Sequence, residues 1–239
     1  MAKIIKKLLL KFSRVIFWII PKELREEKYK KKLQQIMENN LAEETFKTFK
    51  DDFKKSVLFY DTTQEIREYA IKTSLLNDKN NEFYYLEFGV YKGRGANLFS
   101  KYVKKFYAFD SFEGLKEDWA GSSMQKGKFS LNKKIPKLNS NVEPIIGWVE
   151  DTLDDFLKKH NPKINFVHFD MDTYSPTKFT LEKIKPFLVK DAILVFDELF
   201  NFIGWEHSEY KALYEVFKES EFIYKAFRIN AEQSVIQIK

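Results

Sequence analysis

From residue 82 onward, short apolar runs alternate with helical stretches, and this alternation constrains the fold more than any other feature. The run 83–88 is nearly continuously apolar, as expected of a strand that is buried on both faces. Strands that alternate with helices predict an α/β fold with a doubly wound, mostly parallel sheet. Strands are expected at 83–88, 106–110, 142–146, 164–169 and 192–196, with helices at 95–104, 151–159, 177–188 and 205–218.

Two final apolar runs, 222–227 and 234–238, predict a C-terminal antiparallel strand pair that closes the sheet. We therefore assign residues 82–239 to one α/β domain. Residues 33–81 predict a helical cap that ends in a polar turn at 77–81, and residues 1–32 form a basic, amphipathic N-terminal segment. The expected helices are 28–39, 41–53 and 64–75, the last capped by Thr62 or Thr63.

The N-terminal segment has apolar residues at helical spacing between lysines. Lys11 and Arg14 interrupt the apolar run, which argues against a transmembrane span, and no small-residue cleavage site follows it. Residues 1–20 therefore predict a helix that either lies on an anionic membrane surface or packs on protein; helical periodicity does not separate the two.

Charge and cysteine content narrow the class of protein. Residues 1–32 carry eleven Lys or Arg and three Glu, so their positive excess is larger than the whole-chain net charge of +6. The rest of the chain, which includes the α/β domain, therefore has no excess of basic residues. A nucleic-acid partner is therefore not expected. The absence of Cys excludes disulfides, thiolate metal sites and cysteine nucleophiles, and it fits a reducing, cytoplasmic location, possible also at the inner face of the membrane.

Glycine or acidic residues stand where the predicted strands end. Gly89, Asp110, Asp170 and Asp197 follow four of these strands. Ligands of open α/β sheets bind beyond the carboxyl ends of the strands, so several acids at one edge indicate a polar ligand site. A single acid of this kind is more often a helix cap.

The first of these ends reads Glu87-x-Gly89-x3-Gly93, and Asp110 lies at the end of the next strand. Glycines let the backbone turn and approach a ligand closely. A carboxylate at the following strand end can accept both ribose hydroxyls of an adenosine ligand. The glycine spacing differs from the G-x-G-x-x-G dinucleotide pattern. The loop and Asp110 together predict a nucleoside-type cofactor.

Four strings in the chain resemble the macrocin O-methyltransferase family of class I methyltransferases. They are Leu-Glu-Phe-Gly-Val-Tyr-Lys-Gly at 86–93, Phe-Asp-Ser-Phe-Glu-Gly-Leu at 109–115, Gly-Trp-Val-Glu-Asp-Thr-Leu at 147–153 and Asp-Met-Asp-Thr-Tyr-Ser-Pro-Thr at 170–177. The likeness covers about residues 82–200 and includes Lys-Gly-Lys-Phe at 126–129. It implies a Rossmann-like fold and S-adenosylmethionine as methyl donor.

The resemblance also implies where the donor binds. Gly89 would approach the methionine moiety, Glu87 would lie near its amino group, and Asp110 would hold the ribose. Trp148 would lie near the adenine, although core packing is an equal alternative for an aromatic residue. The implied donor-binding residues are Glu87, Gly89, Val90, Tyr91, Lys92, Gly93, Asp110, Ser111, Trp148 and Asp170.

By the same resemblance, Asp170, Asp197 and Glu198 would bind a divalent cation such as Mg²⁺, with Glu198 where the family has Asp. A cation there could bind two oxygens of an acceptor diol and lower the pKa of the attacking hydroxyl. Asp172 would be a supporting residue or a helix cap. Asp170 and His207 are the candidate catalytic residues, although a surface position is the favoured interpretation of His207.

These residues predict a methyltransferase acting on a sugar or polyol hydroxyl of a small-molecule or glycan acceptor. The sequence leaves open a nicotinamide-dependent oxidoreductase and a non-catalytic, membrane-associated scaffold with the same fold. It also leaves open the acceptor and the oligomeric state.

If residues 1–20 bind membranes, the full chain should float with liposomes that contain anionic lipid, whereas residues 33–239 should stay at the bottom of the gradient. Flotation with neutral liposomes is the control. Equal behaviour of the two proteins on anionic liposomes would contradict the membrane interpretation.

Overall fold

The computed structural model describes residues 22–119 and 121–239, and the chain divides into two compact units, residues 1–48 and 49–239. The predicted membrane-binding helix at 1–20 lies outside the described residues. Helix α2 (Lys22–Phe53) is continuous where the sequence predicted two helices. Its sequence contains no Gly or Pro and is rich in Lys, Glu, Gln and Leu, which favour an unbroken helix.

Residues 49–239 form an α/β unit around one sheet of eight strands, in the order β1-β7-β8-β6-β5-β2-β3-β4. Strand β8 runs antiparallel to its neighbours β6 and β7, and the other pairs are parallel. This confirms the doubly wound, mostly parallel sheet with a C-terminal antiparallel pair. The strands are β1 (Val57–Phe59), β2 (Tyr84–Phe88), β3 (Phe106–Asp110), β4 (Val142–Ile146), β5 (Ile164–Phe169), β6 (Leu188–Phe196), β7 (Phe222–Arg228) and β8 (Ser234–Ile238).

Strand β1 is a correction to the sequence prediction, which placed only helices before residue 77. It has three residues, none of them buried, and it pairs in parallel with β7. A strand this short has too few residues to show alternation, so the pairing with β7, and not the local pattern, decides its conformation.

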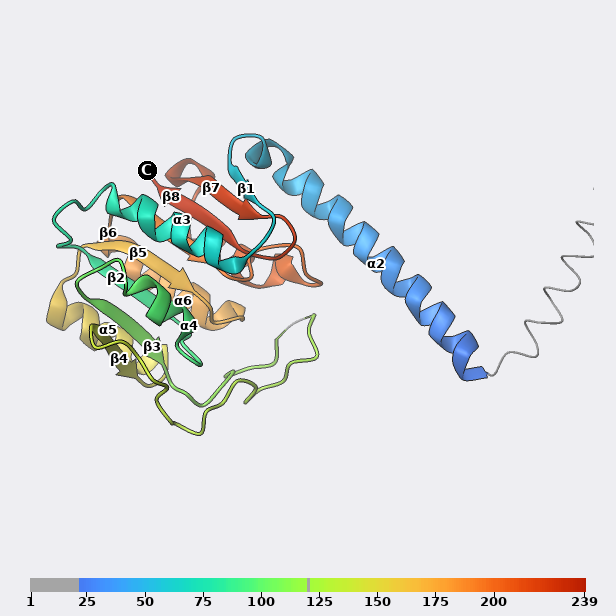
Figure 1. The fold of residues 1–239 in the computed structure, drawn as a ribbon, viewed down its shortest axis with the longest axis horizontal. Coiled ribbons are helices and arrows are strands. Elements are labelled where there is room, and N and C mark those ends of the chain that lie inside the picture. The colour runs from blue at the N-terminus through green and yellow to red at the C-terminus, as the bar shows by residue number, and fades with distance from the viewer. Residues whose placement is uncertain (1–21, 120) are drawn as a thin grey trace, which may run out of the picture. The chain divides into compact units, whose positions relative to one another are not determined.

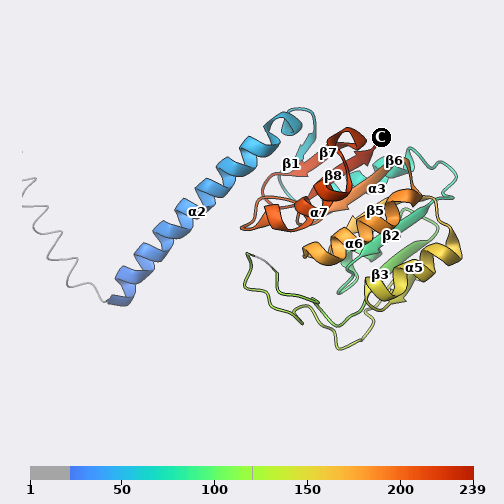
Figure 2. The same cartoon turned by 180° about the vertical axis from the view of Figure 1, so that it is seen from behind.

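Helices cover both faces of the sheet. In Figure 1, α3 (Thr63–Leu75) and α4 (Arg94–Phe99) lie in front of the strands, whereas α5 (Val149–His160), α6 (Tyr174–Ile184) and α7 (Glu209–Val216) cover the face seen in Figure 2. Short 3₁₀ turns are η1 (Lys185–Phe187), η2 (Trp205–His207) and η3 (Glu219–Glu221).

Local chemistry sets the helix boundaries. Thr62 caps α3, because its side chain accepts a hydrogen bond from the Glu65 N–H while the Glu65 carboxylate accepts one from the Thr62 N–H. Helix α6 ends four residues before the predicted boundary, since Pro186 follows at once in η1. The predicted helix 205–218 is divided into η2 and α7 at Ser208.

The core is rich in phenylalanine, as the composition suggests. Every residue of β5 is buried, and Phe88, Phe109, Phe169 and Phe196 form a row of stacked rings across β3, β2, β5 and β6. A second aromatic cluster joins Phe49 and Phe53 to Phe200, Trp205 and Phe227. None of the helices described within 22–119 and 121–239 is long and apolar enough to cross a bilayer.

Asp78 fixes the turn that leads into β2. Its carboxylate is buried and accepts hydrogen bonds from the Glu82 and Phe83 N–H groups and from the Tyr85 hydroxyl. Asp78→Ala should lower the free energy of unfolding by about 2–3 kcal/mol, because it leaves the buried Tyr85 hydroxyl and two partly buried N–H groups without their charged acceptor. Urea denaturation measures this, with the exposed Asp155→Ala as control. Equal stability of the two variants would contradict the assignment.

Candidate active site

The turn after β2 is shaped by glycine and held by Asp110. Gly89 has φ +87°, and a Cβ built on it would lie 1.7 Å from the carbonyl oxygen of Asp170. Only glycine fits between these two strand ends. Asp110 Oδ2 accepts hydrogen bonds from the N–H groups of Val90 (2.8 Å) and Tyr91 (2.7 Å), and Oδ1 accepts one from Phe112 (2.6 Å). Asp110 therefore ties the end of β3 to the glycine turn.

A cavity of about 980 Å³ opens beyond the carboxyl ends of β2, β3, β5 and β6. Ligands of doubly wound sheets bind at this edge, near the point where the strand order reverses. Its volume lies at the upper end of the range of about 300–1,000 Å³ for small-molecule sites, which leaves room for a donor and an acceptor together.

Most of the predicted site residues line this cavity. They are Gly89, Val90, Tyr91, Lys92, Asp110, Ser111, Trp148, Asp170, Asp197 and Glu198. Trp148 is half-buried and lies under the ammonium group of Lys116, so it is a wall of the cavity as well as a packing residue.

Three predicted residues lie elsewhere. Gly93 does not line the cavity; it caps α4 with φ +75°. His207 is exposed in η2 and also lies outside the lining, so the structure gives no geometric support to a role as general base. Glu87 is buried behind the cavity wall, and a Cβ at Gly95 would collide with its carboxylate.

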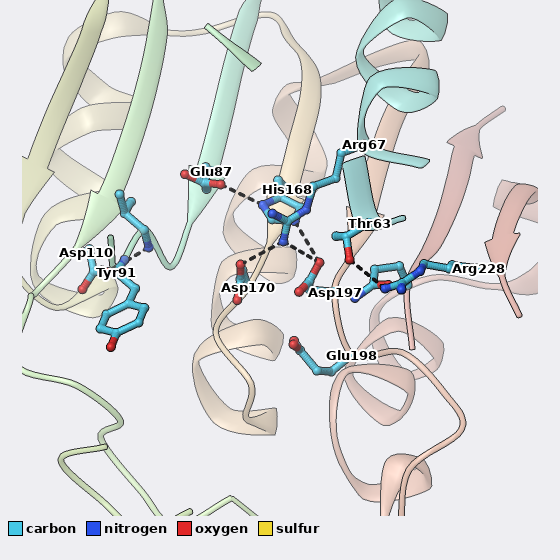
Figure 3. A network of polar contacts seen from close by, with 12 residues as sticks. Thr63, Arg67, Glu87, Tyr91, Asp110, His168, Asp170, Asp197, Glu198 and Arg228 are labelled. Carbon is cyan, nitrogen blue, oxygen red and sulfur yellow. Dashed lines mark hydrogen bonds and ion pairs between the residues drawn. The ribbon is translucent and has the colours of Figure 1, made fainter. Parts of the chain in front are cut away.

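Glu87 belongs instead to a buried ionic network (Figure 3). Its Oε1 lies 2.9 Å from Nδ1 of His168, and Nε2 of His168 lies 3.5 Å from Oδ1 of Asp197. Burial opposes protonation of His168, as does nearby Arg67, but the contacts with Asp197 and Glu87 prevail and raise its pKa to about 9. The network therefore contains a buried imidazolium at neutral pH.

Arg67 extends this network from α3 to the strand ends. Its Nη2 lies 2.7 Å from Oδ1 of Asp197 and 3.3 Å from Oδ2 of Asp170. Burial opposes ionisation of Asp197, but contact with His168 and the charge of Arg67 hold its pKa below its usual value. Asp197 is therefore a carboxylate with two cationic partners.

The acids on the other side of Asp170 have no such partners among the described residues. Asp170, Asp172 and Glu198 each offer an oxygen, and these oxygens lie within 4.8 Å of one another. Burial and the Asp197 carboxylate raise the pKa of Asp170 to about 7, and burial and Asp170 raise that of Asp172 to about 8. Burial and the nearby carboxylates of Asp197, Asp172 and Asp170 raise the pKa of Glu198 well above its usual value.

Sequence reasoning missed Arg67 and gave Asp172 only a supporting role. A signal for Arg67 was present, since this charged residue falls on the same helical face as the buried residues Ile66, Ala70 and Ile71 of α3. A charged residue on a buried helix face needs a partner of opposite charge. Its partners lie more than one hundred residues later in the chain, so only the tertiary structure identifies them.

Comparisons with known proteins agree with this geometry. A family described as a methyltransferase domain matches residues 86–199. No curated protein matches the chain. Among solved structures, the calicheamicin methyltransferase CalS11 has a TM-score of 0.61 and 21% identity over 73% of this chain and 77% of its own. The O-methyltransferase NovP has a TM-score of 0.54 and 18% identity over 74% of this chain and 79% of its own.

At these identities, the two solved structures show a shared fold, and the family match supplies the class. Residues 86–199 match a methyltransferase domain, and the fold around them is shared with these two methyltransferases. The family match agrees with the class of enzyme that the sequence strings implied.

Gly89 and Gly127 offer a matched test of the glycine turn, since both have positive φ but only Gly89 has a close neighbour. Gly127→Ala should cost about 1–2 kcal/mol of stability through backbone strain alone. Gly89→Ala should cost about 2–3 kcal/mol more, because the new methyl group pushes β2 away from β5. It should also abolish binding of S-adenosylhomocysteine. Thermal unfolding and calorimetry measure both effects; equal losses in the two variants would contradict the steric argument.

Proposed function

We propose that this protein transfers the methyl group of S-adenosylmethionine to a hydroxyl group of a sugar or polyol, with a divalent cation assisting. The observation that carries the proposal is the arrangement of the cavity. The Gly89–Asp110 turn forms one part of its wall, and the carboxylates of Asp170, Asp172 and Glu198 form another. A donor and a polar acceptor can thus meet in one cavity.

The donor half of the site comes from β2, β3 and the turn after β4. Asp110 is partly exposed to the cavity. Its Oδ2 already accepts two backbone N–H groups, whereas Oδ1 accepts one and keeps a lone pair. Oδ1 would accept a ribose hydroxyl of the donor. Gly89 would leave room for the methionine moiety, and the Trp148 ring would cover the adenine.

The acceptor half is built from acids that fit a divalent cation. Glu198 is buried, and its Oε2 has no hydrogen-bond partner among the described residues. Together with Asp170 and Asp172 it presents hard oxygen ligands within one small space, which Mg²⁺ prefers. The longer side chain of Glu198, where the family has Asp, therefore still reaches the other acids.

A bound cation would supply Lewis-acid activation of the acceptor hydroxyl. The chain itself would supply the alignment of donor and acceptor. Asp170 joins the two halves, because its backbone carbonyl packs against Gly89 while its one-third-exposed side chain reaches the acid cluster. We therefore keep Asp170 as the candidate catalytic residue, placed beside the acceptor hydroxyl.

The printed names of the similar structures support an oxygen acceptor. CalS11 is described as a TDP-rhamnose 3'-O-methyltransferase and NovP as an O-methyltransferase. Because the identities are low, these names guide the choice of acceptors to test. Sugars and polyols with neighbouring hydroxyl groups are the first set.

Calorimetry with S-adenosylhomocysteine tests the donor site. The protein should bind S-adenosylhomocysteine and not NAD, and Asp110→Ala should weaken binding by about a hundredfold or more, because it removes both the ribose acceptor and the tether of the glycine turn. Asp155→Ala is the control on an exposed helix surface. Unchanged affinity in Asp110→Ala would contradict the assigned donor site.

A screen of acceptors with isotopically labelled donor tests the reaction. Label should appear on a hydroxyl oxygen of a sugar or polyol. Labelled product with the methyl group on nitrogen or carbon would refute O-methylation while leaving the methyltransferase class intact.

A further inference from the structure

Asp170 lies between two groups of opposite character. On one side, Nη2 of Arg67 lies 3.3 Å from Asp170 Oδ2 and 2.7 Å from Asp197 Oδ1. On the other side lie Asp172 and Glu198. One carboxylate oxygen from each of Asp170, Asp172 and Glu198 lies within 4.8 Å of the other two. Figure 3 shows Arg67 reaching both aspartates from α3 and Glu198 approaching from the opposite side.

Asp197 is already engaged by cationic groups of the chain. Its Oδ1 accepts a hydrogen bond from Arg67 and lies 3.5 Å from Nε2 of His168. The other ring nitrogen of His168, Nδ1, lies 2.9 Å from Oε1 of Glu87. The side chains of Arg67 and Asp197 are each only 13% exposed. A divalent cation bound to Asp197 would have to displace a buried arginine or lie beside it, and both are unfavourable where charges are poorly screened.

Glu198 is in the opposite situation. Glu198 is only 7% exposed, and one of its carboxylate oxygens lies within 4.8 Å of oxygens of Asp170 and Asp172. Its Oε2 has no donor among the described residues. No Lys, Arg or His of the described chain forms an ion pair with Asp172 or Glu198. A buried carboxylate without a partner is costly, so this side of Asp170 favours a bound positive charge.

We infer that the divalent cation of this protein binds to Asp170, Asp172 and Glu198, and that Arg67 keeps Asp197 out of the ligand set and lowers the affinity for the cation. This set differs from the Asp170, Asp197 and Glu198 set that the family resemblance implies. The inference rests on the proposed function for the presence of a cation.

Arg67 acts in two ways in this arrangement. Its hydrogen bonds go to Asp197 Oδ1 and Asp170 Oδ2, so it competes with a cation for both carboxylates. Its positive charge also repels a second cation nearby. Arg67 lies on α3, which precedes the residues 86–199 that match the methyltransferase domain. A residue outside the matched segment thus changes the cation affinity of a site whose ligands lie inside it.

Binding of Mn²⁺ to the full-length protein, measured by calorimetry and by the electron paramagnetic resonance signal of free Mn²⁺, tests the inference. Asp172→Asn and Glu198→Gln should each weaken Mn²⁺ binding by about tenfold or more, since each removes a charged ligand. Asp197→Asn should weaken binding clearly less than Asp172→Asn does, because it removes a nearby negative charge but no ligand. Arg67→Met should strengthen binding by about tenfold, through loss of a competing cation.

Two further variants separate this effect from misfolding. Arg67→Lys keeps the positive charge, so its Mn²⁺ affinity should stay near that of the unaltered protein even if Arg67→Met is unstable. Arg94→Met removes an arginine that lines the same cavity but forms no ion pair with the acids among the described residues, and it should leave Mn²⁺ binding unchanged. S-adenosylhomocysteine binding and the melting temperature, measured on every variant, report folding.

Several outcomes would overturn the inference. One is an Asp197→Asn variant that loses Mn²⁺ as strongly as Asp172→Asn does. Another is an Arg67→Met variant that is folded but binds Mn²⁺ no more tightly. If the unaltered protein binds S-adenosylhomocysteine but no Mn²⁺, the cation site is refuted and the methyltransferase stands; if it binds neither, the proposed function fails as well.

Discussion

The contact of Arg67 with Asp170 and Asp197 is the interaction on which the acid cluster at the ends of β5 and β6 depends. It joins α3 to the ends of β5 and β6, and it places one positive charge against two carboxylates. Behind it, Glu87 and His168 add a second buried pair. Removing one partner of a buried pair costs about 3–5 kcal/mol, so these strand ends stay together only while the network is complete. The same charges leave Glu198 and Asp172 as the acids without a cationic partner among the described residues.

The glycine turn after β2 depends on a different constraint, which is steric. Gly89 packs against the carbonyl oxygen of Asp170 more closely than any side chain allows, and Asp110 fixes the backbone that follows it. Asp170 therefore touches the donor turn through its backbone and the acid cluster through its side chain. One residue therefore sets the position of the glycine turn relative to the acid cluster.

Much of this could be predicted because the information is local. Apolar runs of strand length, a glycine at one strand end and acids at the following ends can be recognised from neighbouring residues alone. The strands 106–110, 142–146 and 164–169 have the predicted bounds. Strand β1 was missed, since a three-residue strand carries no clear local signal. Helix α2 was predicted as two helices, although no Gly or Pro divides it.

The sequence by itself determined most of the sheet, the glycine turn and the acid at the end of the next strand, because those depend on residue type and short spacing. Only the tertiary structure decided how the acids are used. It turned Glu87 toward His168 and left His207 outside the cavity, and it brought Arg67 to Asp197 across 130 residues of chain. Long-range ion pairs depend on how helices and strands pack, and neighbouring residues in the sequence do not encode that distance.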